Sequence, residues 1–250
     1  MGKESNIQWC DATWNIARGC TKVDADCDNC YMFRESLNAT RYTPEGPVRT
    51  KTVFNLPLKL KEPSKIFTSS LTDVFHEAID PFRDEVWAII RKCSQHQFLM
   101  LTKRIDRVAA LLPSDWGNGY ENVWLGTSVG HQDAVHRLET LKKIPAKIKF
   151  VSFEPLWSSV TCDLKGIDWI IIGGESGNEN GSSKYRPCEY QWIQHLVEQG
   201  RDAGCAVFVK QLGTYLAKDL RGTGCDRHGG NWDFFPESLK IREFPNNLKN

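Results

Sequence analysis

The sequence lacks a long apolar run. No stretch reaches the roughly 20 apolar residues of a membrane-spanning helix, and the first residues do not contain the apolar core of a secretory signal. We therefore expect no membrane segment and a cytoplasmic location. Thiols in the reducing cytoplasm act as metal ligands or packing groups rather than in disulfides, and the odd count of nine cysteines agrees with this.

The sequence also has almost no net charge. Its 32 Lys and Arg residues nearly balance its 31 Asp and Glu residues, which leaves a formal charge of +1. This balance argues against a protein that binds nucleic acid through its overall charge, and it leaves a local basic groove open. A composition of 40% hydrophobic and 25% charged residues, without a low-complexity tract, indicates one globular body.

Three of the nine cysteines, Cys20, Cys27 and Cys30, lie within eleven residues. Thiolates gathered in this way indicate a zinc site or an iron–sulfur cluster. A closed zinc site needs four ligands, and Cys10 is the nearest candidate for the fourth, although C-x9-C-x6-C-x2-C is not a common zinc spacing. Three cysteines alone would hold three irons of a [4Fe–4S] cluster and leave the fourth iron open to a small ligand. The spacing leaves both alternatives open.

Short apolar segments alternate with amphipathic ones along the rest of the chain. This alternation predicts an α/β fold with parallel strands and helices outside, either a partial or complete (β/α) TIM-like barrel or a doubly wound open sheet. The expected strands are 5–15, 65–70, 97–102, 123–128, 147–152, 168–173 and 206–210. The expected helices are 31–37, 80–92 (with Asp80 as its cap and Pro81 at its first position), 105–112, 132–143 and 189–203. We expect a single domain over 1–250, with a loop insertion around 40–64 and a C-terminal cap around 214–250.

Polar residues follow the apolar run of nearly every expected strand. Ligands of parallel α/β folds bind at the carboxyl ends of the strands, so these residues are candidates for the lining of one mouth. The alternative is that strand ends are polar because they meet water. The residues are Ser69, Ser70, Asp73, Thr102, Lys103, Arg104, Thr127, Ser128, Ser152, Glu154, Glu175, Ser176, Lys210 and Gln211.

Several separated segments carry a resemblance that covers nearly the whole chain. They are 7–15, 67–76, 99–104, 123–128, 150–156, 169–177 and 207–213, together with the three cysteines. On these segments the chain resembles a phage-associated, radical-SAM-like family with a three-cysteine motif. The usual C-x3-C-x2-C spacing of radical-SAM enzymes is lengthened here, because six residues separate Cys20 from Cys27.

The resemblance implies that Cys20, Cys27 and Cys30 hold a [4Fe–4S] cluster, which binds S-adenosylmethionine at its open iron and generates a 5′-deoxyadenosyl radical. It also implies a barrel and a flavodoxin- or ferredoxin-like reductant. We expect cofactor contacts from five residues, namely Ser69, Ser70, Asp73, Thr127 and Ser128. We expect catalytic or substrate-facing roles for five more, namely Lys103, Arg104, Glu154, Glu175 and Lys210.

The substrate implied by the resemblance is a nucleobase or nucleoside, for example a hypermodified pyrimidine in phage DNA. The segment 40–65 is basic and contains Tyr42, so it either follows a phosphate backbone or forms a solvated Lys-rich loop. The alternative function is a non-catalytic, zinc-stabilised protein that binds nucleic acid or a protein partner. Replacing Cys10 separates the two functions, because only the zinc site needs it.

Overall fold

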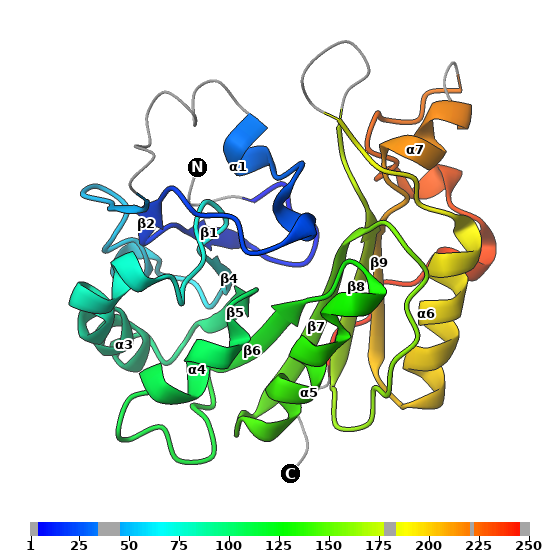
Figure 1. Ribbon diagram of the computed structural model, residues 1–250. Coiled ribbons are helices and arrows are strands. Elements are labelled where there is room, and N and C mark those ends of the chain that lie inside the picture. The colour runs from blue at the N-terminus through cyan, green and yellow to red at the C-terminus, as the bar shows by residue number, and fades with distance from the viewer. Residues whose placement is uncertain (1–4, 35–45, 178–183, 221–222, 246–250) are drawn as a thin grey trace. The chain divides into compact units, whose positions relative to one another are not determined.

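The structure is a computed structural model that describes residues 5–34, 46–177, 184–220 and 223–245. The chain divides into two compact units (Figure 1). The first contains Met1–Thr127 and Lys143–Lys147, and the second contains Ser128–Lys142 and Ile148–Asn250.

The first unit is built on parallel strands. In spatial order they are β1 (Ala12–Trp14), β4 (Lys65–Thr68), β5 (Gln97–Thr102) and β6 (Val123–Ser128). Helices α3 (Arg83–Lys92) and α4 (Ile105–Leu111) connect β4 to β5 and β5 to β6. Every residue of β6 is buried, as is typical of a strand inside a parallel sheet.

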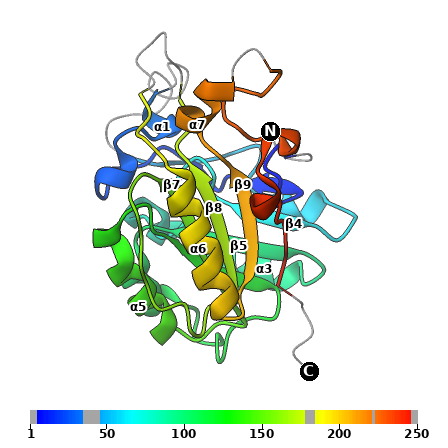
Figure 2. The ribbon, with the colours of Figure 1, turned by 90° about the vertical axis from the view of Figure 1, so that its right-hand side faces the viewer.

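The second unit has the same alternation. Its strands β7 (Ile148–Leu156), β8 (Trp169–Gly174) and β9 (Ala206–Gln211) pair in parallel. The segment before β7 contains η4 (Gln132–Val135) and α5 (His136–Lys143). Helix α6 (Tyr190–Asp202) lies along β8 and β9 (Figure 2) and buries Ile193, Leu196, Val197 and Gly200 against them. This spacing places all four on one helical face.

The seven strands of the main sheet follow the order β1-β4-β5-β6-β7-β8-β9. Parallel strands joined by helices in this order make the fold a partial β/α barrel, which confirms the expected class. Among the described residues, no helix is both long enough and apolar enough to cross a membrane.

Short elements surround the strands. In the first unit they are β2 (Ala17–Arg18), antiparallel to β3 (Val48–Arg49), with η1 (Ala25–Cys27), α1 (Tyr31–Arg34), η2 (Pro57–Lys59) and η3 (Glu77–Phe82). In the second unit they are α7 (Thr214–Ala217), η5 (Lys218–Leu220), η6 (Trp232–Phe234) and η7 (Glu237–Leu239). Residues 40–45 of the expected insertion, and 221–222 and 246–250 of the expected cap, lie outside the described residues.

The first expected strand is shorter than 5–15. The N–H of Ser5 donates to the carbonyl of Asp11 at 3.0 Å, which closes residues 5–11 into a turn ahead of β1. Trp9 packs against Phe67 with a ring separation of 4.6 Å. The apolar alternation in this stretch therefore reflects turn residues that pack onto the sheet, and not strand pairing.

The helix expected over 80–92 begins later, at Arg83. Pro81 lies inside the preceding η3, and Asp80 does not cap α3. The carboxylate of Asp80 instead accepts hydrogen bonds from Arg83 at 2.6 Å and from Arg107 at 2.5 Å. The two guanidinium groups take the oxygens that a cap would have offered to backbone N–H groups.

Candidate functional site

The three-cysteine loop follows β1 and β2 in the first unit. At its start the N–H of Gly19 donates to the carbonyl of Leu71, just beyond the end of β4, at 3.1 Å. Gly19 has a φ of +106°, and a Cβ there would lie 3.1 Å from the carbonyl oxygen of Gly46, so the turn requires glycine. The loop thus begins at the carboxyl edge of β1 and β4, the edge at which parallel α/β folds bind ligands.

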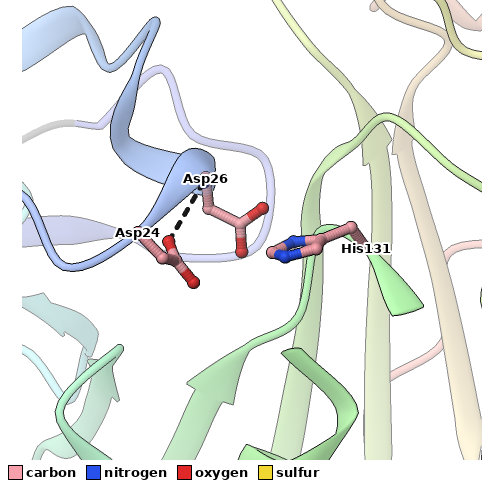
Figure 3. Close-up of side chains that lie close together, drawn as sticks. All are labelled: Asp24, Asp26 and His131. Atoms are coloured by element: carbon pink, nitrogen blue, oxygen red, sulfur yellow. Dashed lines mark hydrogen bonds between the residues drawn. The ribbon is translucent and has the colours of Figure 1, made fainter. Parts of the chain in front are cut away.

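The longer gap between Cys20 and Cys27 contains a turn of helix. The carboxylate of Asp24 caps η1 by accepting the N–H of Asp26 at 3.0 Å (Figure 3). The N–H of Cys30 then donates to the carbonyl of Cys27 at 3.2 Å. Two consecutive turns therefore hold the backbone at the second and third cysteines.

The three thiols lie close enough to influence one another. The pKa of Cys20 is raised to about 11, mainly by burial and next by nearby Asp73, while Arg104 opposes the rise. Cys27 and Cys30 also raise the pKa of Cys20. A metal bound through Cys20 would have to displace the thiol proton, so its affinity would depend on pH.

A zinc site and an iron–sulfur cluster require different separations of their ligand sulfurs. Among the described residues, Cys20, Cys27 and Cys30 do not bring all three Sγ atoms within 4.8 Å of one another. Zinc–sulfur bonds of about 2.3 Å in a tetrahedron place the sulfurs about 3.8 Å apart. A cubane cluster spreads its cysteines over separate irons, so its ligand sulfurs lie further apart. In this structure the three thiols are therefore not drawn together as the ligands of one zinc ion would be.

Cys10 lies near the opposite edge of the first unit's sheet. Its neighbour Asp11 donates its N–H to the carbonyl of Lys65, at the amino end of β4, at 2.8 Å. Gly19 pairs with Leu71, beyond the carboxyl end of the same strand. Lys65 and Thr68, the two ends of β4, are three residue steps or about 10 Å apart, at about 3.3 Å per residue. Cys10 is therefore not placed as a fourth ligand of the loop.

Arg104, at the end of β5, joins the loop to the sheet. Its Nη1 donates to Sγ of Cys20 at 4.0 Å, and its Nη2 donates to the carbonyl and hydroxyl oxygens of Thr21 at 3.0 and 2.7 Å. Nη1 also pairs with Oδ2 of Asp73 at 3.4 Å. The Arg104 and Asp73 side chains are only 10% and 8% exposed, so this pair is shielded from water.

The carboxylate of Asp73 is occupied by groups of the protein. It accepts hydrogen bonds from the hydroxyl of Thr102 at 2.7 Å and from the N–H groups of Lys103 and Phe75 at 3.0 and 2.9 Å. With Arg104, these donors account for the roughly four acceptor positions of a carboxylate. Asp73, expected to contact the cofactor, thus holds Arg104 and the end of β5 in place.

Buried hydroxyl groups lie at the end of β4. The side-chain oxygens of Thr68, Ser69 and Thr72 are buried without a hydrogen-bond partner, and Ser69 has a φ of +71°. The hydroxyl of Ser70 is instead bound to the Asn15 amide at 3.1 Å. Buried polar atoms normally have hydrogen-bond partners. These three hydroxyls lack a partner within the described part of the protein and are therefore suited to bind a polar ligand at this edge.

Thr127 and Ser128 end β6 and have structural partners. The hydroxyl of Thr127 donates to the carbonyl of Thr102 at 2.8 Å, and this side chain is fully buried. The carbonyl of Ser128 accepts from Arg137 at 3.1 Å within the second unit. Thr127 therefore supports the junction of β5 and β6.

In the second unit, Lys210 and Glu154 form an ion pair at the ends of β9 and β7. Nζ of Lys210 lies 2.8 Å from Oε1 of Glu154, and the hydroxyl of Ser152 donates to Oε2 at 3.2 Å. A Cβ on Gly173 would lie 2.7 Å from Oε1. Glycine at this position therefore leaves room for the carboxylate.

Glu175 follows β8 and is 4% exposed. Its carboxylate accepts three hydrogen bonds from Arg186, from the backbone N–H at 2.7 Å, from Nε at 3.0 Å and from Nη2 at 2.6 Å. The ion pair with Nη2 adds charge to these hydrogen bonds. The evident role of Glu175 is to orient Arg186.

Arg186 belongs to a stack that the sequence did not reveal. Its guanidinium lies 4.4 Å from the ring of Trp157, and the rings of Trp157 and His131 stack at 4.7 Å with an angle of 29°. Each of these residues is isolated in its own segment of the sequence, so no local pattern marked them. The fold of the second unit brings them together.

The glycines of the Gly173–Gly177 segment serve packing. A Cβ on Gly174 would lie 2.3 Å from the carbonyl oxygen of Leu212, and one on Gly213, whose φ is +89°, would lie 2.7 Å from Gly174. The chain segments after β8 and β9 therefore touch backbone to backbone. This explains the glycines without a bound phosphate, in agreement with the lack of a nucleotide-binding pattern.

Comparison with known proteins gives a family and no relatives of known function. No curated protein and no solved structure matches the chain. A family model described as "Protein of unknown function (DUF5131)" matches residues 4–236. The chain therefore belongs to the DUF5131 family.

Proposed function

We propose that this protein is a radical S-adenosylmethionine enzyme in which Cys20, Cys27 and Cys30 hold a [4Fe–4S] cluster. The observation that carries the proposal is the position of the loop, which begins at the carboxyl edge of β1 and β4 and is tied to β5 by Arg104. Cys10 is held near the amino end of β4 while the loop begins beyond its carboxyl end, which leaves three thiols for the site.

The bound cluster and S-adenosylmethionine together supply a 5′-deoxyadenosyl radical, which abstracts a hydrogen atom from an unactivated carbon. The chain's own residues bind and orient. The unpartnered hydroxyls of Thr68, Ser69 and Thr72 offer hydrogen bonds to the polar groups of the cofactor. The ammonium of Lys103, at the end of β5, offers positive charge to its carboxylate.

The substrate class that we propose is a nucleobase or nucleoside. Bases bind to proteins by stacking on aromatic rings and guanidinium planes, and the second unit provides both in Trp157 and Arg186. The Lys210–Glu154 pair adds a donor and an acceptor for the edge of a base. A flavodoxin- or ferredoxin-like protein is the electron donor that we propose.

The cluster is tested by metal and sulfide analysis of protein purified without oxygen. We expect about four irons and four sulfides per chain and a visible spectrum that bleaches with dithionite. Cys20→Ser, Cys27→Ser and Cys30→Ser should each lose most of the iron, whereas the matched control Cys10→Ser should keep it. One zinc per chain, a colourless protein and loss of metal in Cys10→Ser would overturn the proposal in favour of a zinc-stabilised protein.

The substrate class is tested separately with the loaded, reduced protein. Mass spectrometry should detect 5′-deoxyadenosine when S-adenosylmethionine is added. Deuterated nucleosides or deuterated DNA should increase its formation and transfer deuterium to it. If 5′-deoxyadenosine forms but no nucleoside or DNA changes its amount or labelling, the enzyme class stands and the substrate class is wrong.

A further inference from the structure

We propose that Arg104 raises the reduction potential of the cluster at Cys20 and that Asp73 lowers it. This inference rests on the proposed function, because it needs a cluster on the three cysteines. It concerns two side chains that the sequence placed at the mouth as catalytic or cofactor-binding groups. In the structure both act on the cysteine loop.

The geometry brings a full positive charge to one ligand sulfur. Nη1 of Arg104 lies 4.0 Å from Sγ of Cys20 and 3.4 Å from Oδ2 of Asp73. Nη2 of the same guanidinium is held by both oxygens of Thr21. Arg104 is thus attached on one side to the residue after the ligand and on the other to Asp73, which leaves it little freedom to move away.

Burial makes these charges effective. The side chains of Arg104 and Asp73 are 10% and 8% exposed, so water and salt screen them weakly. Hydrogen bonds from Thr102, Lys103 and Phe75 hold the carboxylate of Asp73 in place, so it remains beside Arg104. The potential at Cys20 therefore contains two opposed charges at defined positions, beside that of the more exposed Glu77, whose Oε2 lies 3.8 Å from Nε of Arg104.

The direction of each effect follows from the charge of the electron. Reduction adds one electron from the donor to the cluster and makes it more negative. The Arg104 cation stabilises the reduced form and raises the potential, as hydrogen bonds to cluster sulfurs also do. The Asp73 carboxylate destabilises the reduced form and lowers the potential.

Thr21 provides a matched control without a charge. Its hydroxyl accepts from Arg104 at 2.7 Å and is hydrogen-bonded to the ring of His76 at 2.9 Å. Thr21→Val keeps the size of the side chain and removes these contacts. It therefore loosens the loop while leaving both charges in the protein.

The experiment is an anaerobic redox titration of the purified protein with its cluster, monitored by electron paramagnetic resonance. Iron content is measured on the same samples. Arg104→Gln should lower the equilibrium constant for reduction at least tenfold, which is about 59 mV for a one-electron couple. Asp73→Asn should shift the potential in the opposite direction. Arg104→Lys and Thr21→Val should stay closer to wild type than Arg104→Gln does.

Loss of packing alone would shift both charge variants in the same direction, and that result would overturn the inference. Equal reduction potentials for Arg104→Gln and Arg104→Lys would also overturn the inference. This comparison decides the question even if Asp73→Asn does not fold. Wild-type protein without iron and sulfide would instead refute the proposed function on which the inference depends.

Discussion

Replacing Glu175 by glutamine tests whether this residue anchors Arg186. The variant keeps the shape of the side chain and removes the charge that balances the guanidinium. Removing one partner of a buried ion pair costs about 3–5 kcal/mol. Because the Arg186 side chain is 20% exposed, water can solvate it in part, and we expect a loss at the lower end, about 3 kcal/mol in the free energy of unfolding.

The assay is urea unfolding monitored by circular dichroism, and the free energies of unfolding and the denaturant dependence are compared between variants. A loss of about 3 kcal/mol corresponds to a melting temperature about 6–12 °C lower in a chain of this size. Glu237→Gln is the matched control, because Glu237 pairs with Lys240 while 87% exposed, and it should change stability by less than about 0.5 kcal/mol.

A double-mutant cycle completes this test. Arg186→Met removes the other partner, and the double variant Glu175→Gln, Arg186→Met should lose less stability than the two single variants together. If Glu175→Gln is no more destabilising than Glu237→Gln, the reasoning is refuted. Glu175 would then be free to act as the substrate-facing group that the sequence suggested.

Two further predictions concern packing and acid stability. Gly174→Ala places a methyl group 2.3 Å from the backbone oxygen of Leu212, so it should destabilise the protein by about 1–3 kcal/mol in urea unfolding; an unchanged midpoint would contradict the close contact. Burial alone would raise the pKa of Asp80, but hydrogen bonds from Arg83 and Arg107 outweigh this effect and lower the pKa. A lowered carboxyl pKa stabilises the fold above the unfolded-state pKa of about 3.9, and this contribution is lost as the pH falls through the folded value. Asp80→Asn should therefore be less stable than wild type at pH 6, with a difference that narrows at pH 3, and a gap of equal size at both pH values would count against the ion pairs.

Much of the fold could be predicted because buried parallel strands leave a strong local signal. The expected strands 97–102 and 123–128 agree with β5 and β6, whose residues are nearly all buried. The start of α3 could not be predicted, since Asp80 matches a helix cap in the sequence and only the fold brings Arg107 to its carboxylate. Local sequence gives the preference of a residue, and distant partners decide whether that preference is realised.

The same limit applies to the candidate site. The cysteines could be found from their type and spacing alone. The roles of Asp73 and Glu175 could not be predicted, because the sequence around a carboxylate at a strand end does not show whether it faces a ligand or a guanidinium. Arg186 lies eleven residues after Glu175, and nothing in the intervening sequence indicates that the two meet.

The capped turn between Cys20 and Cys27 has a consequence for recognising such proteins. η1 is a short helical turn with its own cap at Asp24. Residues added in such a turn increase the distance between Cys20 and Cys27 less than residues added to an extended chain would. Residue count is thus a poor measure of the distance between these two cysteines. A search with a fixed cysteine spacing would pass over chains that differ only by such a turn.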